Sequence, residues 1–311
     1  MPAKVIQLCG LVPDGEDELR RDYDVCRWDE VADKQGWLAE HGPAVRAVVT
    51  AGHLGIDNEL ANRLPNLGLV AIAGVGYERV DRELAKTRGI RVTNTPNVLT
   101  EDVADLAVGL MIGAMRRLPQ ADAHVRGGHW TTTDMPLATK ASGRRYGIFG
   151  LGQIGGAVAR RLEGFGGSIA YTSTAVKPVV YRYIPRLVDL ARETDVLILT
   201  AAVGPATRHA VNREVLEALG PQGFLVNVGR GALVDEPALV EALQARRIAG
   251  AGLDVFADEP NVPAELAALP NVVLAPHVGS ATVDARQAMA RLMLGNMKAF
   301  FAGTPLPTPV V

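Results

Sequence analysis

The chain has 311 residues, 48% of them hydrophobic, and this length favours two domains of ordinary size. Its formal net charge of −2 argues against nucleic-acid or anionic-membrane binding, which usually requires a basic surplus. The two cysteines, Cys9 and Cys26, lack metal-ligand spacing, and no apolar run resembles a secretory signal or a bilayer span, so we expect a cytoplasmic protein with reduced thiols.

The first hundred residues alternate between strand and helix patterns. Short β-branched runs predict strands at residues 4–8, 44–50, 69–74 and 90–95, and helical patterns lie between them at 57–66 and 77–89. Such alternation is typical of a parallel sheet with helices on both faces. We therefore expect a first unit of four or five parallel strands.

A long helix is predicted to follow. Pro96 ends the preceding strand, Thr100 is a plausible N-cap, and Glu101 and Asp102 favour the positive end of a helix dipole. Its long apolar face predicts packing between domains or against a second subunit. Residues 120–143 show mixed polarity and little periodicity, which predicts an extended crossing loop.

The alternation restarts at Tyr146. Strands are expected at 146–150, 168–174, 195–201, 223–229, 251–256 and 272–278, with helices at 153–165, 236–247 and 283–301. This half also reads as a parallel sheet covered by helices. The predicted fold class is therefore α/β, with two doubly wound parallel-sheet domains.

A glycine-rich turn opens this second half. Gly150, Gly152 and Gly155 form a G-x-G-x-x-G pattern between a predicted strand and a predicted helix. In a dinucleotide site the first glycine permits the tight turn, the second admits a pyrophosphate, and the third allows close helix packing. The alternatives are an ordinary structural turn or an S-adenosyl site, but the flanking pattern favours a dinucleotide.

The second strand of this unit ends without the acid that normally binds the adenosine ribose. Ser173 and Thr174 offer hydroxyls there, Lys177 follows, and Arg182 is a more distant cation. A carboxylate would repel the 2′-phosphate of NADP, whereas hydroxyl and ammonium donors suit it. We predict NADP(H) as the preferred cofactor, with an NAD(H) site contacted by backbone and water as the alternative.

Three predicted strands are each followed by a charged or titratable side chain. Arg230 follows one strand, Asp254 and Glu259 follow the next, and His277 follows the third. Carboxyl ends of parallel strands meet at one edge of a sheet, so these side chains can converge. Reduction of a 2-keto acid needs a proton donor and a carboxylate clamp, roles that histidine and arginine fill.

Less specific interpretations exist for the same residues. His277 could be a satisfied core histidine, Glu259 a solvated loop acid, and Asp254 a strand-end group bonded to local backbone. The convergence of His277, Glu259 and Arg230 favours catalysis. We find no metal-ligand cluster in the sequence.

Several spaced motifs resemble one family over nearly the whole chain. "GLGQIGGAVARRL", "NVGRGALVDEPALVEAL", "AGLDVFADEP" and "LAPHVGSAT", with "VGYERVD" and "NTPNVLTEDVADLAVGLM" in the first half, look like the D-isomer-specific 2-hydroxyacid dehydrogenases. The pattern at Ser173, Thr174 and Lys177 is similar to the NADPH-using glyoxylate/hydroxypyruvate reductase branch, which includes plant hydroxyphenylpyruvate reductases. That branch usually has an arginine where this chain has Thr174.

The resemblance implies roles for individual residues. His277 would be the proton donor, Glu259 its partner, and Arg230 the substrate-binding arginine. The implied substrate contacts are Val75, Gly76, Leu54 and Trp130. The implied cofactor contacts, besides the glycines and Ser173, Thr174 and Lys177, are Gln153, Ile154, Val103, Ala201, Thr207, Val228, Asp254 and Gly279.

The resemblance also implies a domain organisation and an activity. Residues 1–97 with 284–311 would form a flavodoxin-like substrate domain, and 98–283 a Rossmann domain with a dimerisation helix and loop that make a homodimer. The expected reaction is NADPH-dependent reduction of glyoxylate, hydroxypyruvate or hydroxyphenylpyruvate to the D-2-hydroxy acid. The alternatives are an NAD-linked D-2-hydroxyacid dehydrogenase, a non-catalytic nucleotide-sensing corepressor or an S-adenosyl transferase.

Overall fold

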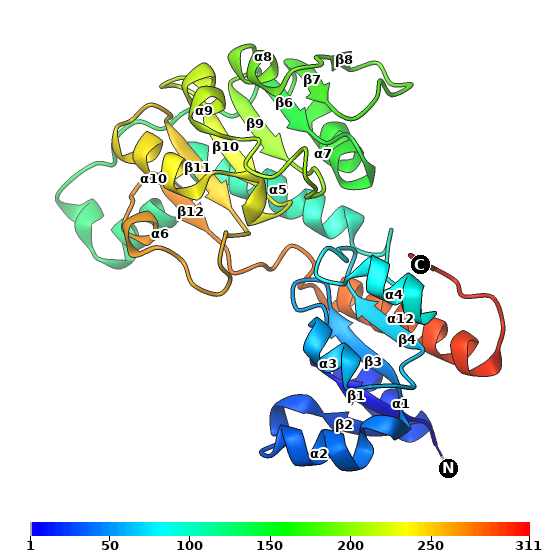
Figure 1. Cartoon of the computed structure of the whole chain (residues 1–311). Coiled ribbons are helices and arrows are strands. Elements are labelled where there is room, and N and C mark those ends of the chain that lie inside the picture. The colour runs from blue at the N-terminus through cyan, green and yellow to red at the C-terminus, as the bar shows by residue number, and fades with distance from the viewer. Residues whose placement is uncertain (1) are drawn as a thin grey trace. The chain divides into compact units, whose positions relative to one another are not determined.

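The computed structural model describes residues 2–311, which form two compact α/β units (Figure 1). The first unit runs to Leu99 and also includes Ala281–Val311, and the second is Thr100–Ser280. The first domain is thus discontinuous in sequence, because the chain returns to it after completing the second unit.

The first unit is built on a five-stranded parallel sheet in the order β2-β1-β3-β4-β5. Its strands are β1 (Lys4–Gln7), β2 (Asp24–Arg27), β3 (Val45–Ala51), β4 (Leu69–Ala73) and β5 (Arg91–Thr93). Apolar side chains of α2 (Lys34–His41), α3 (Asn58–Asn62) and α4 (Arg82–Arg88) pack on one face. Those of α1 (Pro13–Asp22) and α12 (Val283–Ala302) pack on the other.

The C-terminal segment is bonded into the first unit. Thr308 Oγ1 donates to the Asn94 carbonyl at 2.6 Å, and Asn296 Nδ2 donates to Thr308 Oγ1 at 2.7 Å. The Val310 N–H donates to the Val92 carbonyl at 2.7 Å, beside the edge strand β5. These bonds satisfy backbone groups that the sheet edge would otherwise expose.

The second unit has a seven-stranded parallel sheet in the order β12-β11-β10-β9-β6-β7-β8. Its strands are β6 (Arg145–Phe149), β7 (Ser168–Thr172), β8 (Arg182–Tyr183), β9 (Val196–Leu199), β10 (Phe224–Asn227), β11 (Gly250–Leu253) and β12 (Val272–Leu274). The strand order reverses at β6, which places a topological switch point between β6 and β9.

Helices cover both faces of this sheet (Figure 1). Those that pack into one apolar core are α8 (Leu187–Arg192), α9 (Arg213–Leu219), α10 (Glu236–Gln244) and α11 (Ala264–Ala267). The opposite face carries α5 (Thr100–Arg116) and α7 (Gln153–Glu163), and α6 (Leu118–Arg126) follows α5. Gly252 lets α5 lie directly on β11, because a Cβ there would be 2.9 Å from Leu110 Cβ.

The predicted fold class is confirmed, since both sheets are parallel and covered on two faces. The extended loop predicted at 120–143 is wrong in its first part, where α6 and a 3-10 turn, η3 (His129–Thr131), occur. No residue of α6 is buried, and the helix is supported by Pro119 in its first turn and by an Asp122–Arg126 ion pair at 2.8 Å. The sequence analysis also did not predict α1, β2, α2, β8, α8 and α9.

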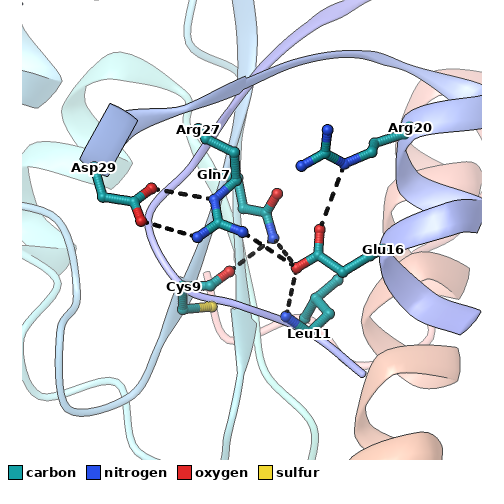
Figure 2. A network of polar contacts seen from close by, with 7 residues as sticks. All are labelled: Gln7, Cys9, Leu11, Glu16, Arg20, Arg27 and Asp29. Atoms are coloured by element: carbon teal, nitrogen blue, oxygen red, sulfur yellow. Dashed lines mark hydrogen bonds and ion pairs between the residues drawn. The ribbon is translucent and has the colours of Figure 1, made fainter. Parts of the chain in front are cut away.

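A polar network lies at the carboxyl end of β1, the switch point of the first sheet (Figure 2). Glu16 Oε1 accepts hydrogen bonds from Gln7 Nε2 and from the Leu11 N–H, both at 2.7 Å. Arg20 and Arg27 lie 3.8 Å from the same carboxylate. The network fixes the connection from β1 into α1, because it satisfies a buried side-chain donor and a loop N–H at once.

Candidate active site

The glycine-rich turn joins β6 to α7 at the switch point of the second sheet. Gly150 has φ +99°, and a Cβ there would lie 2.5 Å from the backbone of Ala201. A Cβ on Gly155 would lie 2.2 Å from the Gly150 carbonyl oxygen, whereas nothing lies within 4 Å of one at Gly152. Two glycines are therefore required by packing, and Gly152 leaves the first turn of α7, which begins at Gln153 and Ile154, open to a pyrophosphate.

The loop after β9 is fixed beside this turn. Thr200 Oγ1 donates to the Gly150 carbonyl at 2.7 Å. Thr207 Oγ1 donates to the Ala202 carbonyl and accepts from the Gly204 N–H, each at 2.8 Å. Thr207 thus stabilises the loop conformation through its own backbone neighbours, as a short hydroxyl side chain commonly does.

The end of β7 carries hydroxyls and no carboxylate. Ser173 Oγ donates to the Ala175 carbonyl at 2.5 Å, Thr174 is exposed, and the Lys177 N–H donates to Tyr171 Oη at 2.7 Å. Arg182 is held by Glu193 through two bonds, of 2.6 and 3.1 Å. A cavity of about 910 Å³, lined in part by Gly152, Gln153 and Lys177, adjoins this strand end.

His277 and Glu259 form a close side-chain pair. Their side chains meet at 2.6 Å between Nδ1 and Oε2, and the Phe256 N–H donates to Glu259 Oε1 at 3.0 Å. The two side chains are only 30% and 22% exposed. With Nδ1 engaged by the carboxylate, Nε2 is the ring nitrogen that can exchange a proton with a bound molecule.

Asp254 organises the loop that carries His277. Its carboxylate is buried and accepts hydrogen bonds from the N–H groups of Val278 at 2.7 Å and Gly279 at 2.9 Å, while its carbonyl accepts from the His277 N–H at 2.8 Å. These bonds hold His277 at φ +54°, in the left-handed region. Burial raises the pKa of Asp254, against the lowering effect of the two backbone donors.

Val103 and Gly279 lie against Asp254. A Cβ on Gly279 would be 3.0 Å from Asp254 Oδ2 and 3.3 Å from a Val103 methyl group. The structure therefore brings together three of the residues predicted to contact the cofactor. Val228, also in that set, is buried directly after β10.

Arg230 follows β10 and precedes a 3-10 turn, η4 (Gly231–Leu233). Asn227 Nδ2 donates to the Arg230 carbonyl at 2.9 Å, and Asn227 Oδ1 accepts from the Gly229 N–H at 3.0 Å. A Cβ on Gly231 would lie 1.9 Å from the Phe256 carbonyl carbon, so this segment abuts the one that bears Glu259. Asn227 and Gly231 were missed in the sequence analysis, although both flank Arg230 in the "NVGRG" motif.

Strand order explains why these groups lie at one edge. Arg230 follows β10, Glu259 follows β11 and His277 follows β12, and these three strands are adjacent and parallel. Their carboxyl ends therefore point the same way. The structure thus gathers a guanidinium, a carboxylate and an imidazole at the carboxyl edge of the second sheet.

The first unit has its own candidate anion site after β4. Asn94 Nδ2 donates to the Val75 carbonyl at 2.8 Å, and Thr95 Oγ1 accepts from the Gly74 N–H at 2.9 Å. Within residues 2–311 the N–H groups of Val75 and Gly76 have no hydrogen-bond partner. Two successive N–H groups of this kind suit a carboxylate. Leu54, in the turn after β3, is 46% exposed.

The remaining candidates lie outside these clusters. Trp130 is 69% exposed on η3. Within residues 2–311 no three His, Cys, Asp or Glu side chains group as metal ligands. None of the helices formed by these residues is long and apolar enough to cross a membrane.

Comparisons with known proteins identify close relatives. The family model described as "D-isomer specific 2-hydroxyacid dehydrogenase, NAD binding domain" matches residues 108–279. Glyoxylate/hydroxypyruvate reductase A of Arabidopsis thaliana and hydroxyphenylpyruvate reductase of Plectranthus scutellarioides are each 47% identical over 308 residues, covering 99% of this chain and 98% of the relative.

Solved structures of similar proteins also superpose on this chain. A 2-hydroxyacid dehydrogenase from Ketogulonicigenium vulgare superposes with a TM-score of 0.93 at 43% identity, covering 100% of this chain and 99% of that one. The NADPH-dependent glyoxylate/hydroxypyruvate reductase of Sinorhizobium meliloti, in complex with NADP and malonate, gives 0.92 at 44% identity, covering 100% and 97%.

The raised pKa of Asp254 predicts an unusual pH dependence of stability. The folded chain binds this proton more tightly than the unfolded chain, so the stabilisation from Asp254 declines as pH rises from its unfolded pKa, about 3.9, through the raised folded value. We expect the free energy of unfolding of the wild type, minus that of Asp254→Asn, to fall as the pH rises above about 4 in urea titrations. A difference that rises with pH would contradict the raised pKa.

Proposed function

The chain belongs to the D-isomer specific 2-hydroxyacid dehydrogenase family, and we propose that it is an NADPH-dependent reductase of glyoxylate and hydroxypyruvate. Like its relatives it is an oxidoreductase that reduces a keto acid to the hydroxy acid. Hydroxyphenylpyruvate is the second candidate substrate, since one relative at 47% identity is named for it. The observation that carries the proposal is the 2.6 Å contact between His277 and Glu259.

The proposed acid is His277. The carboxylate of Glu259 contacts Nδ1 and fixes the orientation of the imidazole ring. Nε2 then donates a proton to the carbonyl oxygen of the substrate as that oxygen becomes an alkoxide. The reduced nicotinamide, when bound, supplies the hydride to the carbonyl carbon.

Carboxylate binding is assigned to directed N–H donors. Arg230 provides a planar guanidinium for the substrate carboxylate and carbonyl, and the N–H groups of Val75 and Gly76 offer a second anion site. Leu54 and Trp130 remain proposed pocket residues.

The cofactor assignment rests on the turn and on the strand end. The open Gly152 position fits a pyrophosphate, and Asp254, Val103 and Gly279 are proposed to hold the nicotinamide carboxamide end. Ser173, Thr174 and Lys177 stand where an acid would favour NAD, which supports NADP(H) as the preferred cofactor. NAD(H) is the alternative.

Steady-state kinetics test this proposal. With glyoxylate and hydroxypyruvate as substrates, we expect kcat/KM for NADPH to exceed that for NADH by about tenfold or more, as a charge-assisted contact to the 2′-phosphate provides. Oxidation of reduced cofactor is followed by absorbance. Equal or higher efficiency with NADH would overturn the cofactor assignment, and no turnover of any 2-keto acid would overturn the reaction.

We further propose a cytoplasmic homodimer. Both cysteines are free, which suits a reducing compartment, and enzyme activity in a secreted fraction of the producing cells would contradict that location. Apolar side chains are unusually exposed on and after α6, namely Leu118, Val125, Trp130 and Leu137. Clustered exposed apolar groups of this kind are typical of a subunit interface.

Light scattering tests the dimer. We expect the wild type to elute at twice the chain mass of 33.0 kDa, and the double variant Leu118→Asp/Val125→Asp to elute as a monomer at micromolar concentration. Val283→Asp, which adds a charge at a 71% exposed site on α12, is the control and should stay dimeric. A monomeric wild type, or a dimeric double variant, would refute this interface.

A further inference from the structure

A cavity of about 910 Å³ runs along one side of α7. One wall is α7 itself, from Gly152 to Glu163, and the other is the loop of residues 177–181. In a dinucleotide site the adenosine ribose lies at the end of the second strand, here β7, so the cavity adjoins the position of a ribose 2′ substituent. The side chains in its walls therefore decide whether a phosphate is accepted there.

Arg160 enters this cavity from the second turn of α7. Helical side chains lean toward the N-terminus of their helix, and the Arg160 Nη1 atom lies 3.9 Å from the point that a Cβ on Gly156 would occupy. The guanidinium therefore lies over the preceding turn of the helix, beside Gly156. Arg160 lines the same cavity as Gly152 and Gln153.

Glu101 of α5 accepts a hydrogen bond from this guanidinium and also has a second cationic partner, Arg161. Arg160 Nη2 donates to Glu101 Oε1 at 3.1 Å, while Glu101 Oε2 is already bound by Arg161 Nη1 at 2.7 Å. Arg161 also binds Asp105 at 2.7 Å, so these acids keep a cationic partner whatever Arg160 does. The exposed Arg160–Glu101 ion pair contributes little stability, because solvent screens it, and does not prevent Arg160 from turning toward a phosphate.

Few other side chains around the cavity are available to neutralise the charge of a phosphate. Arg182 is bound at both terminal nitrogens by Glu193, and Glu163 accepts a hydrogen bond from Tyr181 Oη at 2.7 Å. Lys177 also lines the cavity, and within residues 2–311 it forms no ion pair.

We propose that Arg160 determines cofactor specificity, because its guanidinium and the Lys177 ammonium bind the 2′-phosphate of NADP(H) from the two walls of this cavity. The inference rests on the NADPH preference proposed above and identifies its source. A guanidinium offers paired N–H donors to phosphate oxygens, which a single ammonium does not. Glu101 is then a positioning residue, since it acts only through Arg160.

Binding and kinetics of Arg160→Gln test the proposal. We expect the affinity for 2′,5′-ADP, measured by calorimetry, to fall roughly tenfold, with the affinity for 5′-AMP unchanged within about twofold. The kcat/KM for NADPH should fall by a similar factor while that for NADH stays constant. Arg213→Gln, which removes the same charge from the α9 surface of the same unit, should alter none of these values.

The outcomes separate this inference from the proposed function. A wild type that prefers NADH overturns both. A wild type that prefers NADPH, together with an Arg160→Gln variant that binds 2′,5′-ADP as tightly as the wild type, overturns the role of Arg160 alone. An equal loss with NADPH and NADH, or with 2′,5′-ADP and 5′-AMP, would mean that Arg160 only supports the fold of α7, which also overturns it.

Discussion

The proposed catalytic geometry depends on one hydrogen bond, between His277 Nδ1 and Glu259 Oε2. It joins the segments after β12 and β11, which are adjacent because the two strands pair in parallel. Asp254 stabilises the same arrangement, because its carboxylate accepts hydrogen bonds from the N–H groups of Val278 and Gly279, the two residues that follow His277. A buried carboxylate whose oxygens accept from fixed backbone donors costs less to ionise than an unpaired one. The imidazole is therefore held by backbone geometry as well as by its acidic partner.

The cofactor side of the second unit follows from the same topology. The sheet reverses direction at β6, so the turn after β6 and the loop after β9 meet, and Gly150 and Gly155 allow that contact. The proposed discrimination between NADP(H) and NAD(H) rests on charge at the end of β7, where no acid is present. In the proposal made here, Arg160 of α7 adds a second cation to Lys177 in the cavity beside that strand end.

Much of this organisation could be predicted from the sequence, for identifiable reasons. The strands that precede Arg230, Glu259 and His277 are short apolar runs followed by polar motifs. Both the sheet and the edge that carries these residues could therefore be predicted. Contacts between segments that lie far apart in the sequence could not be predicted from it. Gly231 is required by the Phe256 backbone, and Arg160 faces a cavity whose other wall is the loop of residues 177–181. The exposed helix α6 was missed because its sequence, LPQADAHVR, is of mixed polarity and none of its residues is buried.

The most direct test of the central claim is the rate of keto-acid reduction by His277→Ala, measured at saturating cofactor and substrate. Loss of the general acid predicts a fall in kcat of about 10²-fold or more, with NADPH binding, followed by its fluorescence, unchanged. Added imidazole should restore part of the rate. A variant that retains kcat within a few-fold of the wild type would contradict the assignment of His277 as the proton donor.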